Sequence, residues 1–238
     1  GEADLVEEVL RIHGFDNIPS VSLPKTTPLP QGALSLSQER RGLARRALAS
    51  RGLIEAVTYS FLASAEAEMF GGAPESIRLV NPISADLDVM RPSILPNLIS
   101  AAGRNADRGY ADIALFEVGP QYAGENPGDQ SMVAAGVRAG NAVPRGWTGA
   151  TRAADVFDAK ADALGVLAGI GAPAASIQVV AEAPDWYHPG RSGSIRLGPK
   201  TVLADFGEVH PGILKAMDVA GPIAAFEIHL GAVPLPKG

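Results

Sequence analysis

The chain has 238 residues, is 46% hydrophobic and carries a formal net charge of -6, which suits one large or two small domains with a buried core. The acidic balance argues against non-specific nucleic-acid binding, because such a chain repels the phosphate backbone. The absence of cysteine excludes disulfides, thiolate metal sites and cysteine nucleophiles, and no apolar run of about 18 residues is present to span a membrane.

Residues 4–13 are predicted to form an amphipathic helix that ends at Gly14. Asp4, Glu7 and Glu8 are three and four residues apart, so their carboxylates gather on one helix surface. Three oxygen ligands suit a hard cation such as Mg²⁺. Acids in a first turn also oppose the positive end of the helix dipole, and spacing alone favours this structural interpretation.

Residues 20–34 are rich in proline, serine and threonine, which predicts an extended linker between two modules. A helix is expected over 36–50, with Ser37 as its N-cap and Gly52 after its end. Its surface is expected to carry four arginines, Arg40, Arg41, Arg45 and Arg46. These could contact RNA or the acids of a partner, although such a run often only solvates a helix.

Patterning predicts further strands and helices along the rest of the chain. The predicted strands are 54–61, 77–80, 113–118, 132–139, 177–180, 194–197, 202–209 and 223–230, and the predicted helices are 65–70, 97–107, 155–171 and 212–217. Neighbouring strands joined by tight turns pair antiparallel, and strict strand–helix alternation is missing. The expected fold is α+β, with a mainly antiparallel sheet flanked by helices.

Catalytic signatures are absent: the sequence has no P-loop, dinucleotide-binding glycine motif, nucleophile elbow or zinc-protease motif. His188 and His210 each precede a proline, which favours a structural ring that lies under a turn and bonds a carbonyl. Asp158 and Lys160 could act as a functional pair, but an ordinary ion pair explains them as well.

Seven short motifs follow one another along the chain. They are Tyr59-Ser60-Phe61, Asn81-Pro82, Arg91-Pro92-Ser93-Ile94-Leu95-Pro96, Leu115-Phe116-Glu117-Val118-Gly119, Phe157-Asp158-Ala159-Lys160, His188-Pro189-Gly190-Arg191-Ser192 and Gly207-Glu208-Val209-His210-Pro211. Each is weak alone, but in this order they resemble the phenylalanyl-tRNA synthetase beta subunit family. The resemblance covers the whole chain, from the end of one module through a core similar to class II synthetase catalytic domains.

The resemblance implies a division into 1–19 (the end of the preceding module), 20–34 (the linker), 35–233 (the class II-like core) and 234–238 (a linker to an anticodon-binding module). We therefore expect the chain to be a part of a longer protein. The resemblance also implies a non-catalytic, cytoplasmic subunit that binds the ATP-using alpha subunit. Two chains of each kind would form a heterotetramer, a phenylalanine–tRNA ligase that also binds tRNA.

A class II active site holds ATP phosphates with one arginine on its motif 2 strand and another after a glycine-rich strand. Here residues 121–125 contain no arginine, and residues 224–231 have neither a glycine run nor a following arginine. The resemblance therefore implies no catalytic and no cofactor-binding residues in this chain. Two alternatives remain: an active adenylating enzyme that uses Arg91, and an RNA-binding module that uses the arginine-rich helix.

The family resemblance changes the interpretation of the N-terminal acids. The family binds Mg²⁺ through carboxylates at positions that match Asp4, Glu7 and Glu8. The resemblance thus implies a metal site there in the intact enzyme, with a further acidic ligand expected before Gly1.

Overall fold

The computed structural model describes residues 1–24, 32–143, 146–147 and 149–235, and the chain divides into two units, Gly1–Ala33 and Leu34–Gly238. The first unit contains the helix α1 (Glu2–His13) and a 3-10 turn (Phe15–Asn17). Gly14 ends α1 with a φ of 96°, a backbone conformation that favours glycine. None of the residues of α1 is buried.

The second unit is built on a seven-stranded sheet with the strand order β1-β4-β5-β11-β10-β9-β8. The strands are β1 (Ile54–Glu55), β4 (Ile113–Tyr122), β5 (Gln130–Ala139), β8 (Ile177–Val180), β9 (Tyr187–Leu197), β10 (Thr201–Val209) and β11 (Ile223–His229). Only the pairing of β1 with β4 is parallel among these seven strands. The predicted α+β fold with a mainly antiparallel sheet is confirmed.

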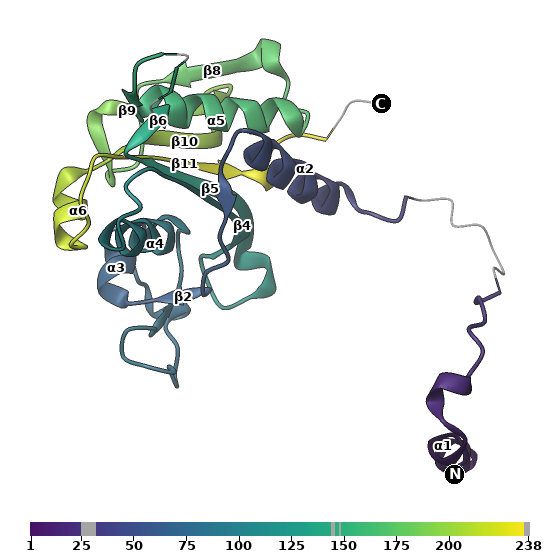
Figure 1. The fold of residues 1–238 in the computed structure, drawn as a ribbon. Coiled ribbons are helices and arrows are strands. Elements are labelled where there is room, and N and C mark those ends of the chain that lie inside the picture. The colour runs from purple at the N-terminus through teal and green to yellow at the C-terminus, as the bar shows by residue number, and fades with distance from the viewer. Residues whose placement is uncertain (25–31, 144–145, 148, 236–238) are drawn as a thin grey trace. The chain divides into compact units, whose positions relative to one another are not determined.

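Helices cover both faces of the sheet (Figure 1). The helices are α2 (Leu36–Ser50), α3 (Ser64–Glu68), α4 (Leu95–Asp107), α5 (Val156–Gly169) and α6 (Pro211–Ala216). Successive side chains of β5 point to opposite faces of the sheet. Ala134 packs in the hydrophobic cluster under α2 and α5, whereas Val133 and Ala135 pack in the hydrophobic cluster under α4 and α6. Two small antiparallel sheets of two strands each lie outside this sheet: β2 (Phe61–Leu62) with β3 (Val89–Met90), and β6 (Asn141–Val143) with β7 (Arg152–Ala153).

The helix over 36–50 is confirmed, but its N-cap is Ser35 rather than Ser37. The Gln38 amide N–H donates to Ser35 Oγ at 3.3 Å, and the Ser35 amide N–H donates to Gln38 Oε1 at 2.9 Å. This reciprocal pair is a capping box, and its Ser-x-x-Gln pattern was available in the sequence.

Two strand predictions are wrong. The predicted strand 54–61 consists of β1 and β2 with irregular backbone between them, and this backbone bonds to the edge of β4 and to Arg91. The predicted strand 77–80 begins instead with a 3-10 turn, Glu75–Ile77, and continues only as a single bridge from Arg78 to Val89. An apolar run of this length does not distinguish a strand from a turn that buries one side chain.

Two strands extend through a proline that the predicted strands left out, because proline is tolerated where no hydrogen bond between strands is lost. β4 continues through Pro120, whose carbonyl faces away from β5 and accepts from Arg91 Nε at 2.9 Å. β9 begins at Tyr187 rather than at residue 194 and contains Pro189. The register of β9 and β10 shifts between Gly207 and Val209, so Pro189 faces no paired residue.

Candidate functional site

The register of the sheet places three carboxylates in one row. Glu117 on β4 is opposite Ala135 on β5, which is opposite Glu227 on β11, which is opposite Asp205 on β10. Residues directly opposite one another across strands share a face. Ala135 packs with the residues under α4, so all three carboxylates lie on that side of the sheet.

Arg91 occupies one end of this row and is fully buried. Its guanidinium donates to Glu117 Oε1 at 2.8 Å, to Thr58 Oγ1 at 2.9 Å and to the Pro120 carbonyl at 2.9 Å. A Cβ on Gly119 would lie 2.5 Å from Arg91 Nη2, so the glycine makes room for this pair. Arg91 is therefore engaged within the fold and is not available as a phosphate ligand.

Glu227 occupies the middle of the row without a strong cationic partner. Its Oε1 accepts from Ser93 Oγ at 2.7 Å and from Gln121 Nε2 at 2.5 Å, both neutral donors. Burial raises the pKa of Glu227, and the hydrogen bond from Ser93, the charge of His229 and the hydrogen bond from Gln121 only partly offset this effect. The fold therefore compensates the ionised form of Glu227 only in part.

Asp205 and His229 lie beside Glu227, with His229 Nε2 3.3 Å from Asp205 Oδ2. Burial lowers the pKa of His229, but the hydrogen bond to Asp205 and the charges of Glu227 and Asp205 outweigh it and leave the pKa raised. Desolvation, followed by the charges of Glu227 and Asp205, raises the pKa of Tyr187 well above its ordinary value. The cluster is acidic, with one histidine as its titratable cation.

This cluster borders a cavity of about 340 Å³. Ser93, Gln121, Asp205, Glu227 and His229 contribute polar groups to its wall. Phe70, Tyr122 and Trp186 add aromatic surface. Among the described residues that line the cavity there is no arginine or lysine.

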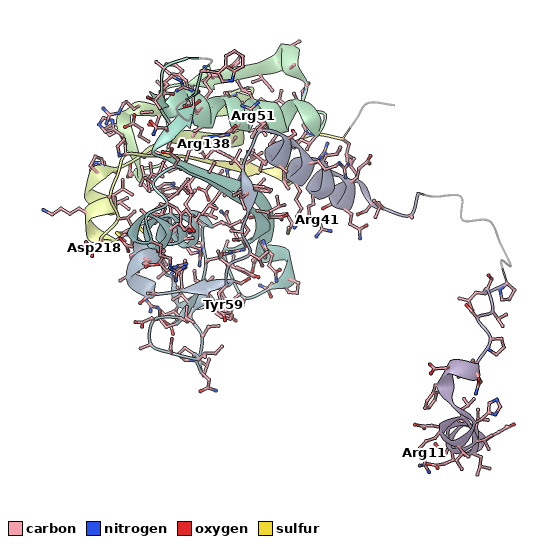
Figure 2. All side chains as sticks on the ribbon, viewed as in Figure 1. Arg11, Arg41, Arg51, Tyr59, Arg138 and Asp218 are labelled. Carbon is pink, nitrogen blue, oxygen red and sulfur yellow. The ribbon has the colours of Figure 1, made fainter. Side chains whose placement is uncertain are left out.

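A second hollow, a groove of about 620 Å³, lies on a different surface. The segment that enters β2 forms one wall with Val57, Tyr59 and Phe61, and the side chain of Tyr59 appears beside β2 in Figure 2. The rings of Tyr59 and Phe61 stack at a centroid distance of 5.8 Å. Val57 is 91% exposed and Tyr59 69% exposed, which is unusual for large apolar side chains that lie so close together.

The N-terminal acids do not form a metal site by themselves. Glu8 pairs with Arg11 at 2.5 Å, and all three predicted ligands are exposed on α1. Within the ranges that the structure describes, no three His, Cys, Asp or Glu side chains are grouped to hold a metal ion. As arranged here the residues do not fit Mg²⁺, and the site at Asp4, Glu7 and Glu8 stays a prediction.

The arginine-rich helix offers less surface charge than predicted. Arg40 is buried and donates to the Val233 carbonyl at 2.6 Å. Arg45 donates to Glu55 at 2.6 Å and to the Val118 carbonyl at 2.9 Å. Two of the four arginines thus bind their own fold, which weakens the RNA-binding alternative.

The loop residues have structural roles that differ in detail from the predictions. His188 Nδ1 and His210 Nδ1 each accept from the backbone N–H two residues later, at 3.0 Å, rather than bonding a carbonyl. Asp158 pairs with Arg152 at 2.6 Å, not with Lys160.

A buried charge cluster on the other face of the sheet went unpredicted. Asp162 on α5 accepts from Arg51 Nε at 2.7 Å and from Arg138 Nε at 2.6 Å. Both arginines lie close to α5 in Figure 2. Because these residues are far apart in the sequence, no local pattern indicates the cluster.

Comparisons with known proteins agree with this geometry. Residues 18–230 match a family model described as the phenylalanyl tRNA synthetase beta chain CLM domain. Relatives named phenylalanine–tRNA ligase beta subunit include those of Rhodospirillum rubrum, 58% identical over 237 residues, and Brucella suis, 53% identical over 241 residues. The chain is covered completely in both matches but spans only 29% and 30% of those relatives.

A solved structure supports the fold assignment alone. The pyrrolysyl tRNA synthetase PylSc of Desulfitobacterium hafniense matches with a TM-score of 0.60 at 16% identity, over 82% of this chain and 64% of that one. The arrangement of sheet and helices is thus similar to that of this synthetase. None of the helices in the described ranges is long and apolar enough to cross a membrane.

Proposed function

We propose a function that starts from one fact: this chain belongs to the phenylalanyl-tRNA synthetase beta chain CLM domain family. In the proposal the chain is the non-catalytic core of a phenylalanine–tRNA ligase beta subunit and binds the catalytic alpha subunit. Two alpha and two beta chains would assemble in the cytoplasm and attach phenylalanine to tRNA, with ATP used by the alpha subunit and Mg²⁺ bound in the intact enzyme.

The residues of the class II-like face support a non-catalytic role. Gln121 occupies the strand where the resemblance leads us to expect an ATP-binding arginine, and it donates to Glu227. β11 ends at His229, which contacts Asp205. Two carboxylates on the cavity wall would repel a nucleotide phosphate, so this face does not favour adenylation.

The observation that carries the partner-binding proposal is the exposed groove beside β2. Val57, Tyr59 and Phe61 form a contiguous apolar and aromatic wall, and large exposed patches of this kind mark protein interaction sites. Glu66, Asp86 and Arg104 also line the groove and supply charged groups beside this wall. We assign the groove to the alpha subunit because the relatives are named as beta subunits.

The test is analytical ultracentrifugation of this chain with the alpha subunit from the same source. The wild-type chain is expected to form a complex that sediments faster than either chain. Tyr59→Asp is expected to weaken the complex by at least about tenfold, because it places a charge in the apolar wall.

Tyr110→Asp is the matched control, since Tyr110 is 66% exposed and lies outside the groove. Equal losses for Tyr59→Asp and Tyr110→Asp would contradict the assignment of the groove. Absence of any complex with the wild-type chain would contradict the partner-binding proposal for this part of the subunit.

A further inference from the structure

The cavity on the α4 side of the sheet combines aromatic walls with acidic groups. Phe70 and Trp186 lie with ring centroids 6.0 Å apart and tilted by 41°. Glu227 and Asp205 line the same space, together with the amide of Gln121. At about 340 Å³ the cavity is at the small end of ligand sites, which limits an occupant to about ten non-hydrogen atoms.

The carboxylate of Glu227 is left with unused hydrogen-bonding capacity. Both of its donors bond to Oε1. Oε2 has no hydrogen-bond partner among the described residues. It is also not fully enclosed by protein atoms, so a ligand or water could reach it. Because Glu227 lines the cavity and Oε2 is not fully enclosed, we infer that Oε2 borders that space.

Charge in the cavity is unbalanced toward the negative. Two carboxylates, Asp205 and Glu227, face one histidine, and that histidine contacts Asp205. The other buried carboxylates differ, since Glu117 is paired with Arg91 and Asp162 with two arginines. A buried carboxylate is costly unless a donor or cation compensates it, so the cavity favours a cationic occupant.

We propose that this cavity binds a small organic cation, a primary ammonium group on an aromatic or apolar body. The ammonium donates to Glu227 Oε2 and is attracted by Asp205, while the body packs on Phe70 and Trp186. An ammonium has three donors and no acceptor, which suits a free carboxylate oxygen. The indole of Trp186 is the best aromatic surface for a nearby cation.

The test is a titration of the 238-residue chain, which contains the complete sheet and both core clusters, followed by ¹⁵N chemical shifts. Three probes share a phenyl body: 2-phenylethylammonium, 2-phenylethanol and phenylacetate. The ammonium is expected to bind about tenfold more tightly than the alcohol, because a hydrogen bond to a charged group exceeds a neutral one. Phenylacetate is expected not to bind, and the shifts are expected at Ser93, Gln121 and Trp186.

Two variants locate the charge. Glu227→Gln keeps the size of the side chain and its acceptor and is expected to abolish the preference for the ammonium over the alcohol. Glu125→Gln removes one negative charge from an exposed position outside the cavity. This variant is expected to keep the preference for the ammonium over the alcohol.

Equal affinity for the ammonium and the alcohol would overturn the proposal, as would an unchanged preference in Glu227→Gln or shifts confined to residues outside the cavity. Should Glu227→Gln fail to fold, as judged by circular dichroism, the three-probe series on the wild type decides alone. The measurement needs no alpha subunit, so its failure leaves the partner-binding proposal intact.

Discussion

Asp162 and Glu227 are both buried carboxylates, 0% and 3% exposed, and they lie on opposite faces of one sheet. Asp162 accepts from two arginines and joins α2, β5 and α5. Glu227 accepts from a serine and a glutamine and borders a cavity. Two equally buried carboxylates therefore have different roles. A carboxylate paired with arginines holds packed elements together, whereas a carboxylate with only neutral donors marks a candidate binding site.

The largest expected effect is at the compensated charge. Asp162→Asn removes the charge and turns an amide N–H₂ toward guanidinium donors, so it is expected to lower the free energy of unfolding by about 3 kcal/mol. Urea denaturation followed by circular dichroism measures this, with Glu125→Gln as the exposed control. A loss below about 1 kcal/mol would show that the cluster adds little stability and that the contrast with Glu227 is wrong.

An intermediate case is the pair of Arg91 and Glu117, which shares a face with Glu227 but is compensated. Gly119→Ala would place its Cβ 2.5 Å from Arg91 Nη2 and 3.1 Å from Glu117 Oε1. Since the arginine is held by several acceptors, we expect a loss of about 2 kcal/mol in unfolding free energy. Gly128→Ala is the matched control, because nothing lies within 4 Å of its added Cβ. Equal stability of the two variants would mean that Arg91 moves freely.

Local patterns were sufficient for many elements of the fold. The helix predicted over 36–50 is present as α2, although its N-cap is Ser35 rather than Ser37, and the helix predicted over 155–171 is present as α5. The local signal of Gly119-Pro120 is that of a breaker and predicts the end of a strand at residue 118. The strand continues since Pro120 turns its missing donor away from β5, and only the arrangement of neighbouring strands reveals this.

The candidate site could be predicted only in part. The motifs drew attention to Arg91, Ser93 and Glu117, but not to what each contacts. Glu227 and Asp205 are adjacent only because β10 and β11 pair in one register, and a shift of one residue would turn Glu227 to the other face. Such register is set by long-range packing, so the row of carboxylates is invisible to local spacing.

The smallest expected effect has the opposite sign to the first two and separates the two carboxylates most clearly. Burial raises the pKa of Glu227 above its ordinary value of 4.5, so the folded state holds this proton more tightly than the unfolded state. Below pH 4.5 both states are protonated, and the neutral group costs little. The tighter proton binding of the folded state contributes to the free energy of unfolding at low pH. As the pH rises through the folded pKa, the wild type loses this contribution, whereas Glu227→Gln has no proton to lose. At pH 7 the variant is expected to be more stable by about 1 kcal/mol, and the difference should vanish near pH 4.

His229 titrates in both proteins, so the quantity to measure is the difference between their urea midpoints across pH 4 to 7. A variant less stable than the wild type at pH 7 would show that Glu227 stabilises the fold as Asp162 does, and the two faces would then no longer differ in kind.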